Sequence, residues 1–423
     1  MLNQRTLLGR SLTESTEIDI SSTFNDDVLS RHCLILGGTG TGKTNLFYHI
    51  VGNIIVNLND NDILMIFDTK GDYYKTFANY CKENSLILSN TEKSSNWNIF
   101  NELIDYDNPN DSLLIANAYE LSKFIFKETI EQSNEPFFAI AASDIFSAIL
   151  ITLCREAIGK KDKRKELTNK KLKNILNVSN GEMLFKLIDV FPDLKSIAYY
   201  IADYNGKTAR SIISVMYSVV RPLLTTGFAE DGSFSIKNFI KRNYEEKNIL
   251  FVEYDLNFGN VLTPIYRTVF DLALKEALGR ANALNSNVYL IIDEFKLLPY
   301  LEHLEDGLNF GRSKGVKIIA GLQSIEQINH LYGESKAKSI ISGFSSLVAF
   351  RPNDSSTRKF ITEYFGTAVV SEQFQSVSRQ MTDKVRDANV VEDWDLQNLK
   401  LGEAITGICE FEPKKYHFAK CEI

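Results

Sequence analysis

Short apolar runs alternate with a helical pattern in the first part of the chain. Cys33–Leu36 and Ile63–Phe67 are continuous apolar runs, and between them residues 45–58 repeat apolar side chains every three to four positions. This order predicts two parallel strands joined by a helix, because a crossover helix must return the chain to the same edge of the sheet. Leu86–Leu88 predicts a third strand.

The middle of the chain, from about residue 94 to 247, has a different pattern. Its apolar residues recur every three to four positions, which predicts helices. The clearest such segments are 111–126, 137–158, 184–191 and 211–224. Ser143 and Asp144 interrupt the most apolar segment, and a charge at the centre of a membrane span is unfavourable. We therefore expect a buried helix there.

The strand pattern returns after residue 248. Apolar runs bounded by polar residues predict strands at 249–252, 288–292, 316–320, 347–350 and 404–409. Helical stretches separate most of these runs. The sequence as a whole therefore predicts α/β segments on both sides of an all-α insertion.

Charge and cysteine content narrow the function classes. The net charge of −7 and the pI near 5.5 exclude a uniformly basic surface, so nucleic-acid binding would need a local patch or a lined channel. The five cysteines form no CxxC pair, which favours reduced thiols over a zinc site or a disulfide framework. Residues 160–173 hold eight Lys or Arg and two acids; they form either a solvated face or a docking patch. No signal peptide is visible, and we expect a cytoplasmic chain.

A glycine-rich loop follows the first predicted strand and precedes the first predicted helix. It fits the pattern GxxxxGK[ST], whose backbone N–H groups surround the phosphates of a nucleotide. We expect ATP to bind at Gly37, Gly38, Thr39, Gly40, Thr41, Gly42, Lys43 and Thr44. Lys43 would reach the β- and γ-phosphates, and the Thr44 hydroxyl would ligate Mg²⁺.

The strand predicted at 288–292 ends on two acids, Asp293 and Glu294. This is the Walker B pattern that completes a P-loop site. Asp293 would hold the Mg²⁺ shell, and Glu294 would orient and deprotonate the attacking water. A solvated acidic turn is the alternative, and the presence of the P-loop argues against it.

Two residues near the next strand are further catalytic candidates. Gln323 follows the strand at 316–320 and is placed to sense the γ-phosphate or hold the lytic water; a helix cap is the alternative. Arg312 precedes that strand, so it would project away from its own P-loop toward a neighbouring subunit; an ordinary surface arginine is the alternative. Asp68 ends the second strand and is expected to contact nucleotide, unless it only forms a tight turn.

Together these motifs resemble the FtsK/HerA superfamily of ring-shaped DNA pumps, and within it the type IV coupling proteins of the TraD/TraG kind. Asp-Thr-Lys-Gly-Asp (68–72), Trp-Asn-Ile-Phe (97–100), the Walker B strand, Gly-Arg-x-x-Gly (311–315) and Leu-Gln-Ser (322–324) follow the P-loop in family order. The resemblance implies a RecA-like P-loop motor domain with a mostly parallel central sheet. We expect a lead-in at 1–30, this domain at 31–93 and 248–423, and an all-α domain at 94–247.

The resemblance also implies an ATP-driven DNA translocase that works as a homo-hexamer. DNA would be gripped without regard to sequence in the ring pore, where Lys70, Lys314 and Lys317 are candidates. Relaxase or secretion-channel proteins would be partners at the inner face of the membrane, although the family's N-terminal membrane helices are not seen here. Two alternatives stay open: a HerA-like motor paired with a nuclease, favoured by Leu8-Gly9-Arg10, and a nucleotide-gated adaptor that pumps nothing.

Overall fold

The computed structural model describes residues 5–7, 15–17, 20–81, 83–91, 94–224, 227–242, 244, 246–280, 286–375, 381–408 and 412–421. The chain divides into two compact units. Unit 1 contains residues 1–58, 289–296 and 308–423, and unit 2 contains residues 59–288 and 297–307. The Leu8-Gly9-Arg10 motif lies outside the described residues.

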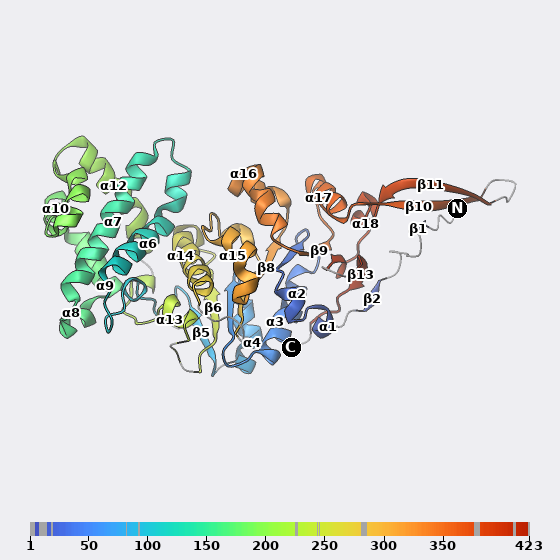
Figure 1. Cartoon of the computed structure of the whole chain (residues 1–423), viewed down its shortest axis with the longest axis horizontal. Helices are drawn as coiled ribbons and strands as arrows, with labels where there is room; N and C mark the ends of the chain where they lie inside the picture. Colours follow the sequence, from blue (N-terminus) through green and yellow to red (C-terminus); the bar gives the residue numbers. More distant parts are fainter. Residues whose placement is uncertain are drawn as a thin grey trace. The chain divides into compact units, whose positions relative to one another are not determined.

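Unit 1 is built on a mixed sheet with a parallel centre (Figure 1). Its strands, in spatial order, are β2 (Thr16–Glu17), β13 (Lys414–His417), β12 (Glu403–Gly407), β9 (Ser346–Phe350), β3 (Cys33–Leu36), β8 (Val316–Leu322) and β7 (Val288–Ile292). β3 is parallel to both β8 and β9, and every residue of these three strands is buried. Continuous apolar strands of this kind are typical of a parallel sheet covered on both faces.

The register of β3 with its neighbours determines where the candidate catalytic residues of unit 1 lie. Leu36, the last residue of β3, is paired with Leu322 in β8 and with Ala349 in β9. The loops after these strands therefore leave the sheet at one edge. Gly37 and Gln323 begin two of those loops, so the predicted phosphate loop and the predicted sensor start side by side.

Helices and a separate ribbon complete unit 1. The helices are α1 (Ile20–Thr23), α2 (Asp26–Leu29), α3 (Lys43–Asn57), α16 (Ile325–Ser342), α17 (Ser355–Phe365) and α18 (Asp393–Gln397), with the 3₁₀ turn η5 (Gly311–Lys314). α15 (Leu304–Phe310) begins in unit 2 and ends in unit 1. A three-stranded antiparallel ribbon contains β1 (Arg5–Leu7), β10 (Thr367–Gln375) and β11 (Met381–Asn389).

Unit 2 joins three parallel strands to a large set of helices. The strand order is β4 (Ile63–Asp68), β6 (Ile249–Glu253) and β5 (Ser85–Leu88). The α-helices are α4 (Asp72–Cys81), α5 (Phe100–Leu103), α6 (Asp111–Glu131), α7 (Pro136–Ala157), α8 (Lys161–Glu166), α9 (Asn169–Val178), α10 (Gly181–Ile188), α11 (Lys195–Ala198), α12 (Lys207–Leu223), α13 (Ile236–Ile240) and α14 (Gly259–Leu278). The 3₁₀ turns are η1 (Pro192–Leu194), η2 (Tyr199–Ile201), η3 (Gly227–Ala229) and η4 (Phe295–Leu297), the last of which spans the end of unit 1 and the start of the 297–307 segment.

The described residues between 94 and 247 are helical, as the periodicity indicates, and form no strand there beyond one isolated bridge between Trp97 and Phe234. The compact units do not follow the predicted domain limits, because β4, β5 and β6 group with the helices. Those limits stay a prediction.

A buried carboxylate, that of Glu102, joins the start of the helical segment to its end. The Glu102 side chain accepts hydrogen bonds from Trp97 Nε1 (2.8 Å) and from the backbone N–H groups of Ile236 (2.6 Å) and Lys237 (3.0 Å). Burial raises the pKa of Glu102, and these donors oppose that effect. Glu102 therefore ties the start of the helical segment to its end, and Trp97 of the Trp-Asn-Ile-Phe motif is part of that link.

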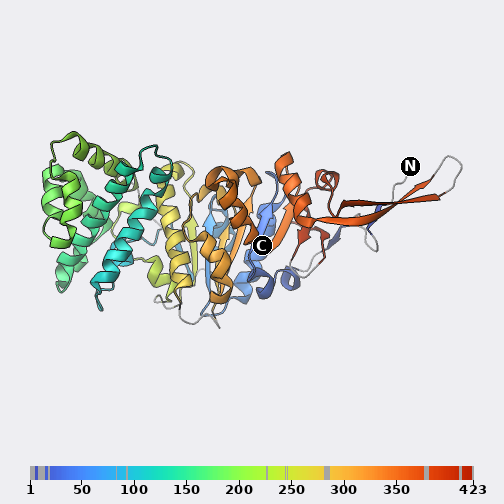
Figure 2. The same cartoon turned by 45° about the horizontal axis from the view of Figure 1, so that its top comes forward.

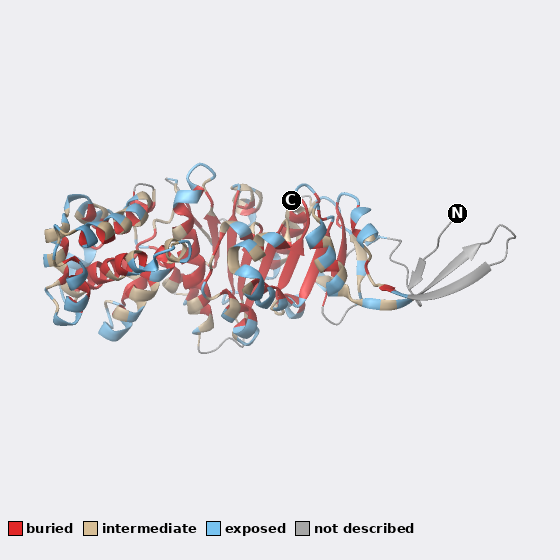
Figure 3. Cartoon of the chain, turned by 90° about the horizontal axis from the view of Figure 1, so that it is seen from above, coloured by how far each residue is buried: buried red, intermediate tan, exposed pale blue. Residues whose placement is uncertain are grey.

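α7 is the apolar helix that the sequence places in the middle segment. It is long and apolar enough to cross a membrane by length and composition, and 78% of its most apolar 18-residue window is buried within the protein. It packs against α6 and α12 (Figure 2). Buried positions run along most of its length, whereas exposed positions follow the outer sides of the surrounding helices (Figure 3). The expected buried helix is confirmed.

The basic segment 160–173 lies mainly on the surface of unit 2. Several of its cations pair with acids there: Arg164 with Asp107 (2.8 Å) and Lys163 with Glu156 (3.5 Å). Isolated pairs of this kind contribute little to stability because water screens them. They favour a solvated face over a docking patch.

Candidate active site

The loop after β3 curls back over the start of α3. Gly40 and Gly42 have φ angles of 75° and 116°, in the left-handed region that favours glycine. A Cβ on Gly42 would also lie 3.3 Å from the Cα of Gly402. The Thr41 hydroxyl donates to the carbonyl of Gly38 (2.8 Å), which holds the loop closed. Only a glycine-rich sequence can follow this path.

Lys43 lies inside this loop. Its Nζ donates to the carbonyls of Gly37 (2.6 Å) and Gly38 (3.0 Å), and its side chain is nearly buried. The amine is thus held above the loop, beside the first turn of α3, whose free N–H groups carry partial positive charge. A phosphate group at this position would meet the amine and the backbone donors together.

The Walker B acids face the same loop. The Thr44 hydroxyl donates to Asp293 Oδ2 at 3.0 Å, across 249 positions of sequence. A hydroxyl and a carboxylate beside a phosphate-binding loop are hard oxygen ligands of the kind that Mg²⁺ prefers. The two residues predicted as metal ligands are therefore in contact, and their chemistry fits Mg²⁺.

Gly321 is a residue that sequence reasoning missed. It lies within β8, and a Cβ there would come within 2.1 Å of the Asp293 carbonyl. Any side chain would push β8 away from the end of β7. A glycine inside an otherwise apolar strand is the available signal, because it marks a close approach of two backbones.

Gln323 connects the Walker B glutamate to the P-loop. Its Nε2 donates to both carboxylate oxygens of Glu294 (3.1 and 3.0 Å), and its Oε1 accepts from the Thr39 hydroxyl at 3.2 Å. Gln327 and Lys296 support this arrangement: Gln327 Oε1 accepts from the Gln323 backbone N–H, and Lys296 Nζ lies 3.6 Å from Glu294. Sequence reasoning missed both, because their contacts depend on the packed structure.

Arg312 lies on η5 and is 57% exposed. Its NH2 is 3.5 Å from Asp27 Oδ1, and the same carboxylate pairs with Arg31 (3.3 Å). Among the described residues, no hydrogen bond or ion pair joins Arg312 to the P-loop of its own chain. Its exposure agrees with the predicted role at a neighbouring subunit, and that role stays a prediction.

The expectation that Lys317 contacts DNA in the pore is wrong. As a candidate pore residue it should be exposed, but it is only 3% exposed and its Nζ lies 2.8 Å from Asp26 and 4.7 Å from the ring centre of Tyr289. Burial opposes ionisation of Asp26, yet hydrogen bonds with Lys317 and Tyr289 lower its pKa. Both faces of β8 are covered, and Asp26 and Tyr289 enclose the Lys317 amine, so Lys317 is not an exposed pore residue.

A family model described as "Type IV secretion-system coupling protein DNA-binding domain" matches residues 20–407. The chain belongs to the type IV secretion-system coupling proteins. Its resemblance to that group, inferred from the order of the motifs, is confirmed.

Two coupling proteins illustrate the relationship. The chain is 22% identical to "Coupling protein TraD" of Escherichia coli strain K12 over 375 residues, which cover 86% of this chain and 47% of TraD. It is also 22% identical to "Type IV secretion system-coupling protein VirD4" of Bartonella henselae over 377 residues, covering 85% of this chain and 56% of VirD4. The chain thus spans about half the length of the curated relatives it matches.

Solved structures of a bacterial conjugative coupling protein, TrwB, share the fold. One matches with a TM-score of 0.75 at 20% identity, covering 94% of this chain and 86% of that one. TrwB has also been solved with the non-hydrolysable ATP analogue ADPNP and with ADP and Mg²⁺. The likeness confirms the predicted α/β, RecA-like fold with its mostly parallel sheet.

Asp68, in unit 2 of this coupling protein, has a local structural role. Its carboxylate accepts from the backbone N–H groups of Lys70 (3.3 Å), Asp72 (3.1 Å) and Tyr74 (3.0 Å) and so caps the start of α4. Burial raises its pKa, and the three donors oppose that effect. The predicted contact between Asp68 and nucleotide stays a prediction. Lys70 is exposed, as a DNA contact requires.

The chain that follows the Walker B acids is anchored in unit 2. Glu302 Oε2 lies 2.6 Å from Lys127 Nζ, and His303 Nε2 lies 3.0 Å from Glu120 Oε1. The His303 backbone N–H donates to Asp271 Oδ1 at 3.1 Å. Residues 302–303 are therefore held by α6 and α14 within unit 2.

Asp271→Asn is expected to change the pH dependence of stability. Burial raises the pKa of Asp271 to about 7, and hydrogen bonding and charge from His303 oppose that effect. An unfolded Asp titrates near about 3.9, so the folded state binds the proton more tightly and loses stability as the pH rises from about 4 to about 7. Asn keeps the acceptor for His303 and carries no charge. The melting temperature of the variant should therefore rise relative to that of the wild type as the pH is raised from 5 to 8.

The measurement is thermal unfolding followed by circular dichroism at several pH values. Asp162→Asn is the matched control, because Asp162 is exposed on α8 and should show no such trend. A difference between Asp271→Asn and wild type that stays constant from pH 5 to pH 8 would contradict the assignment.

Proposed function

We propose that the chain is an Mg²⁺-dependent ATPase that drives DNA through a ring of identical subunits. The bridge from Glu294 through Gln323 to Thr39 is the observation that carries this proposal. It joins a candidate general base to the phosphate loop through an amide that can respond to the γ-phosphate. A protein that only binds nucleotide has no need of this arrangement.

Each residue of the candidate site would have a separate role in hydrolysis. Lys43 would leave its loop carbonyls for the β- and γ-phosphate oxygens, and Thr44 and Asp293 would hold Mg²⁺. When bound, Mg²⁺ neutralises charge on the phosphate oxygens. Glu294 would orient the attacking water and accept its proton. Gln323 is supported in the sensor role because its two hydrogen-bonding ends face both partners.

Arg312 supports the ring. An exposed arginine on η5 acts in catalysis only if a second copy brings a nucleotide to it, and head-to-tail contacts that close generate a ring. We propose a homo-hexamer. The matched family is described as DNA-binding, and the net acidity of the chain favours DNA contacts in a lined pore, with Lys70 as the exposed candidate.

The candidate binding partners are inferred from the family to which the chain belongs. We propose that a relaxase or a secretion-channel component recruits the ring to the inner face of the membrane. A nuclease among its binding partners would instead favour a HerA-like role in repair or defence. Hydrolysis that ignores DNA would favour the nucleotide-gated adaptor.

The deciding experiment is steady-state ATPase activity with and without single- and double-stranded DNA, together with the mass of the assembly. We expect DNA to stimulate hydrolysis and the mass to match a closed ring in the presence of nucleotide. A monomer whose hydrolysis is indifferent to both forms of DNA would overturn the ring-motor proposal.

A further inference from the structure

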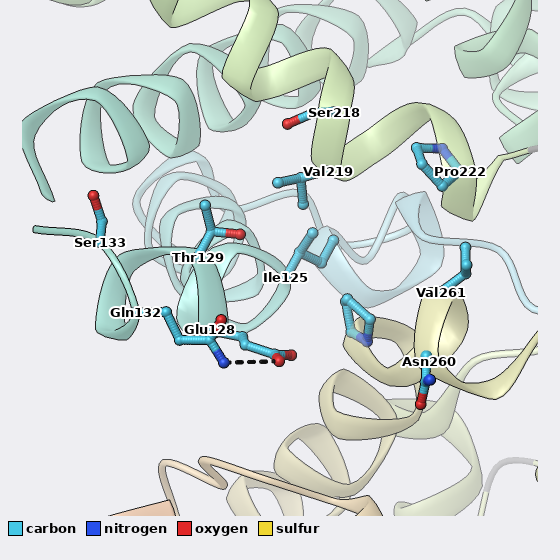
Figure 4. Close-up of a pocket in the computed structure, with 11 residues that line it drawn as sticks. Ile125, Glu128, Thr129, Gln132, Ser133, Ser218, Val219, Pro222, Asn260 and Val261 are labelled. Atoms are coloured by element: carbon cyan, nitrogen blue, oxygen red, sulfur yellow. Dashed lines mark hydrogen bonds between the residues drawn. The ribbon is translucent and has the colours of Figure 1, made fainter. Parts of the chain in front are cut away.

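A pocket of about 560 Å³ opens between three helices of unit 2 (Figure 4). The end of α6, the end of α12 and the start of α14 line it. Its volume lies within the range of small-molecule sites, about 300–1,000 Å³. Several lining residues are exposed, Ser218 and Asn260 among them, so the pocket is open to solvent. The proposed catalytic residues are not part of it.

Two prolines inside helices give this pocket unusual backbone chemistry. Pro222 lies within α12 and Pro264 within α14. Proline has no N–H, so the carbonyl four residues earlier loses its helical donor. Those carbonyls belong to Ser218 and Asn260, and all four residues line the pocket. Two residues that line the pocket therefore carry a backbone carbonyl that their helix leaves without its usual N–H donor.

The charged group at the pocket is also an acceptor. Glu128 is the one charged side chain among the described lining residues. Gln132 Nε2 donates to its Oε1 at 3.2 Å, a contact drawn in Figure 4. Behind it, the NH1 of Arg267 lies 3.5 Å from Oε2, on a side chain that is wholly enclosed. The Arg267 side chain is fixed by bonds to the carbonyls of Phe124 (2.9 Å) and Ile125 (3.1 Å).

This arrangement holds the Glu128 carboxylate from the interior side. Arg267 approaches from within the protein and Gln132 bonds Oε1, while the Glu128 side chain is 35% exposed, so part of the carboxylate is open to a ligand. The Ser218 hydroxyl donates back to Val215 O (2.8 Å), which leaves its lone pairs as acceptors. The pocket thus offers a carboxylate, carbonyls and a hydroxyl oxygen above an apolar wall that includes Ile125 and Pro222.

We propose that this pocket binds an aliphatic organic cation, an alkyl-ammonium or alkyl-guanidinium ion. The charged head would donate to Glu128 and to the carbonyls of Ser218 and Asn260. The methylene body would pack on Ile125 and the proline rings. A bare metal ion is disfavoured, because Glu128 supplies the one carboxylate among the lining residues and no cluster of three or more His, Cys, Asp or Glu side chains that could hold a metal occurs in the described part of the chain. This binding site is independent of the proposed ATP chemistry.

The test uses two probes of the same shape. n-Butylguanidinium carries the charge, and n-butylurea is its neutral counterpart. Each is titrated into the full chain and followed by ligand-observed NMR. We expect the cation to bind at least about 10-fold more tightly than the urea, because a hydrogen bond between two charged groups is stronger than one that involves a neutral donor. Equal affinity for the two probes would overturn the proposal.

Two variants locate the binding. Glu128→Gln should weaken cation binding about 10-fold and leave urea binding unchanged. Pro264→Ala returns an N–H donor to the Asn260 carbonyl and should weaken cation binding several-fold. Pro136→Ala, at the first position of α7, is the matched control and should change nothing. Pro264→Ala decides the matter if Glu128→Gln fails to fold, because alanine favours the helix.

The source of the cation is tested with an acetylated Leu-Arg-Leu amide. The free cation and the peptide share the guanidinium group and differ in the flanking backbone. Binding of the peptide no tighter than n-butylguanidinium supports a small-molecule ligand. Binding about 10-fold tighter, and sensitive to Pro264→Ala, would overturn that assignment in favour of a side chain from another polypeptide.

Discussion

Glu294→Gln is expected to lower the rate of ATP hydrolysis by about 10²–10⁴-fold, because positioned general bases contribute about that much. The substitution keeps the size of the side chain and removes the charge that accepts the proton. Nucleotide affinity should change less than about 3-fold, since Lys43 and the loop amides are untouched. The loss should therefore appear in kcat and leave the binding of a fluorescent ATP analogue intact.

A second substitution in the same unit controls for unspecific effects. Glu326→Gln removes an exposed carboxylate at the start of α16, close in sequence to Gln323, and should leave both rate and binding unchanged. Glu294→Gln retaining more than half of the wild-type rate would exclude Glu294 as the base. In that case the contact between Glu294 and Gln323 would be structural only.

The sequence predicts the core of the site well because its signals are local. The P-loop is a strand, a glycine-rich turn and a helix within about 25 residues, and each part has its own composition. The Walker B strand is similarly a buried run that ends on two acids. Gln323 could be placed because β8 ends next to it. In each case neighbouring residues in the sequence carry the whole signal.

Features that depend on distant pairing escape sequence reasoning. Lys317 looks like an exposed cation until Asp26, from a short helix 291 positions away, is seen beside it. The ribbon at 367–389 is not predicted from the sequence. Its two strands pair through backbone hydrogen bonds and contain many polar residues, so they lack the apolar runs that predict the other strands. Gly321 matters only because the end of β7 approaches it. None of these contacts follows from residue type or spacing alone.

Arg312→Ala is expected to lower ATP hydrolysis by about 10³-fold or more, the range measured for arginines that act on a neighbour's nucleotide. Nucleotide binding should survive, because Arg312 makes no contact with the described P-loop residues of its own chain. Lys338→Ala removes an exposed cation on α16, in the same unit, and should leave most of the activity. Equal losses in the two variants would indicate a general effect of charge or folding.

Mixing two inactive variants separates action in trans from action in cis. Lys43→Ala subunits keep Arg312 and lack a working P-loop, whereas Arg312→Ala subunits have the reverse defect. In rings assembled at random from equal amounts, about a quarter of the sites would combine an intact P-loop with a neighbour's intact arginine. We therefore expect activity to reappear on mixing, at about that fraction of wild type. The mass of the assemblies verifies that mixed rings form. If these mixed rings stay inactive, Arg312 acts on the nucleotide of its own subunit or has no catalytic role. Only an arginine that acts across the interface can be replaced by the arginine of a neighbouring subunit.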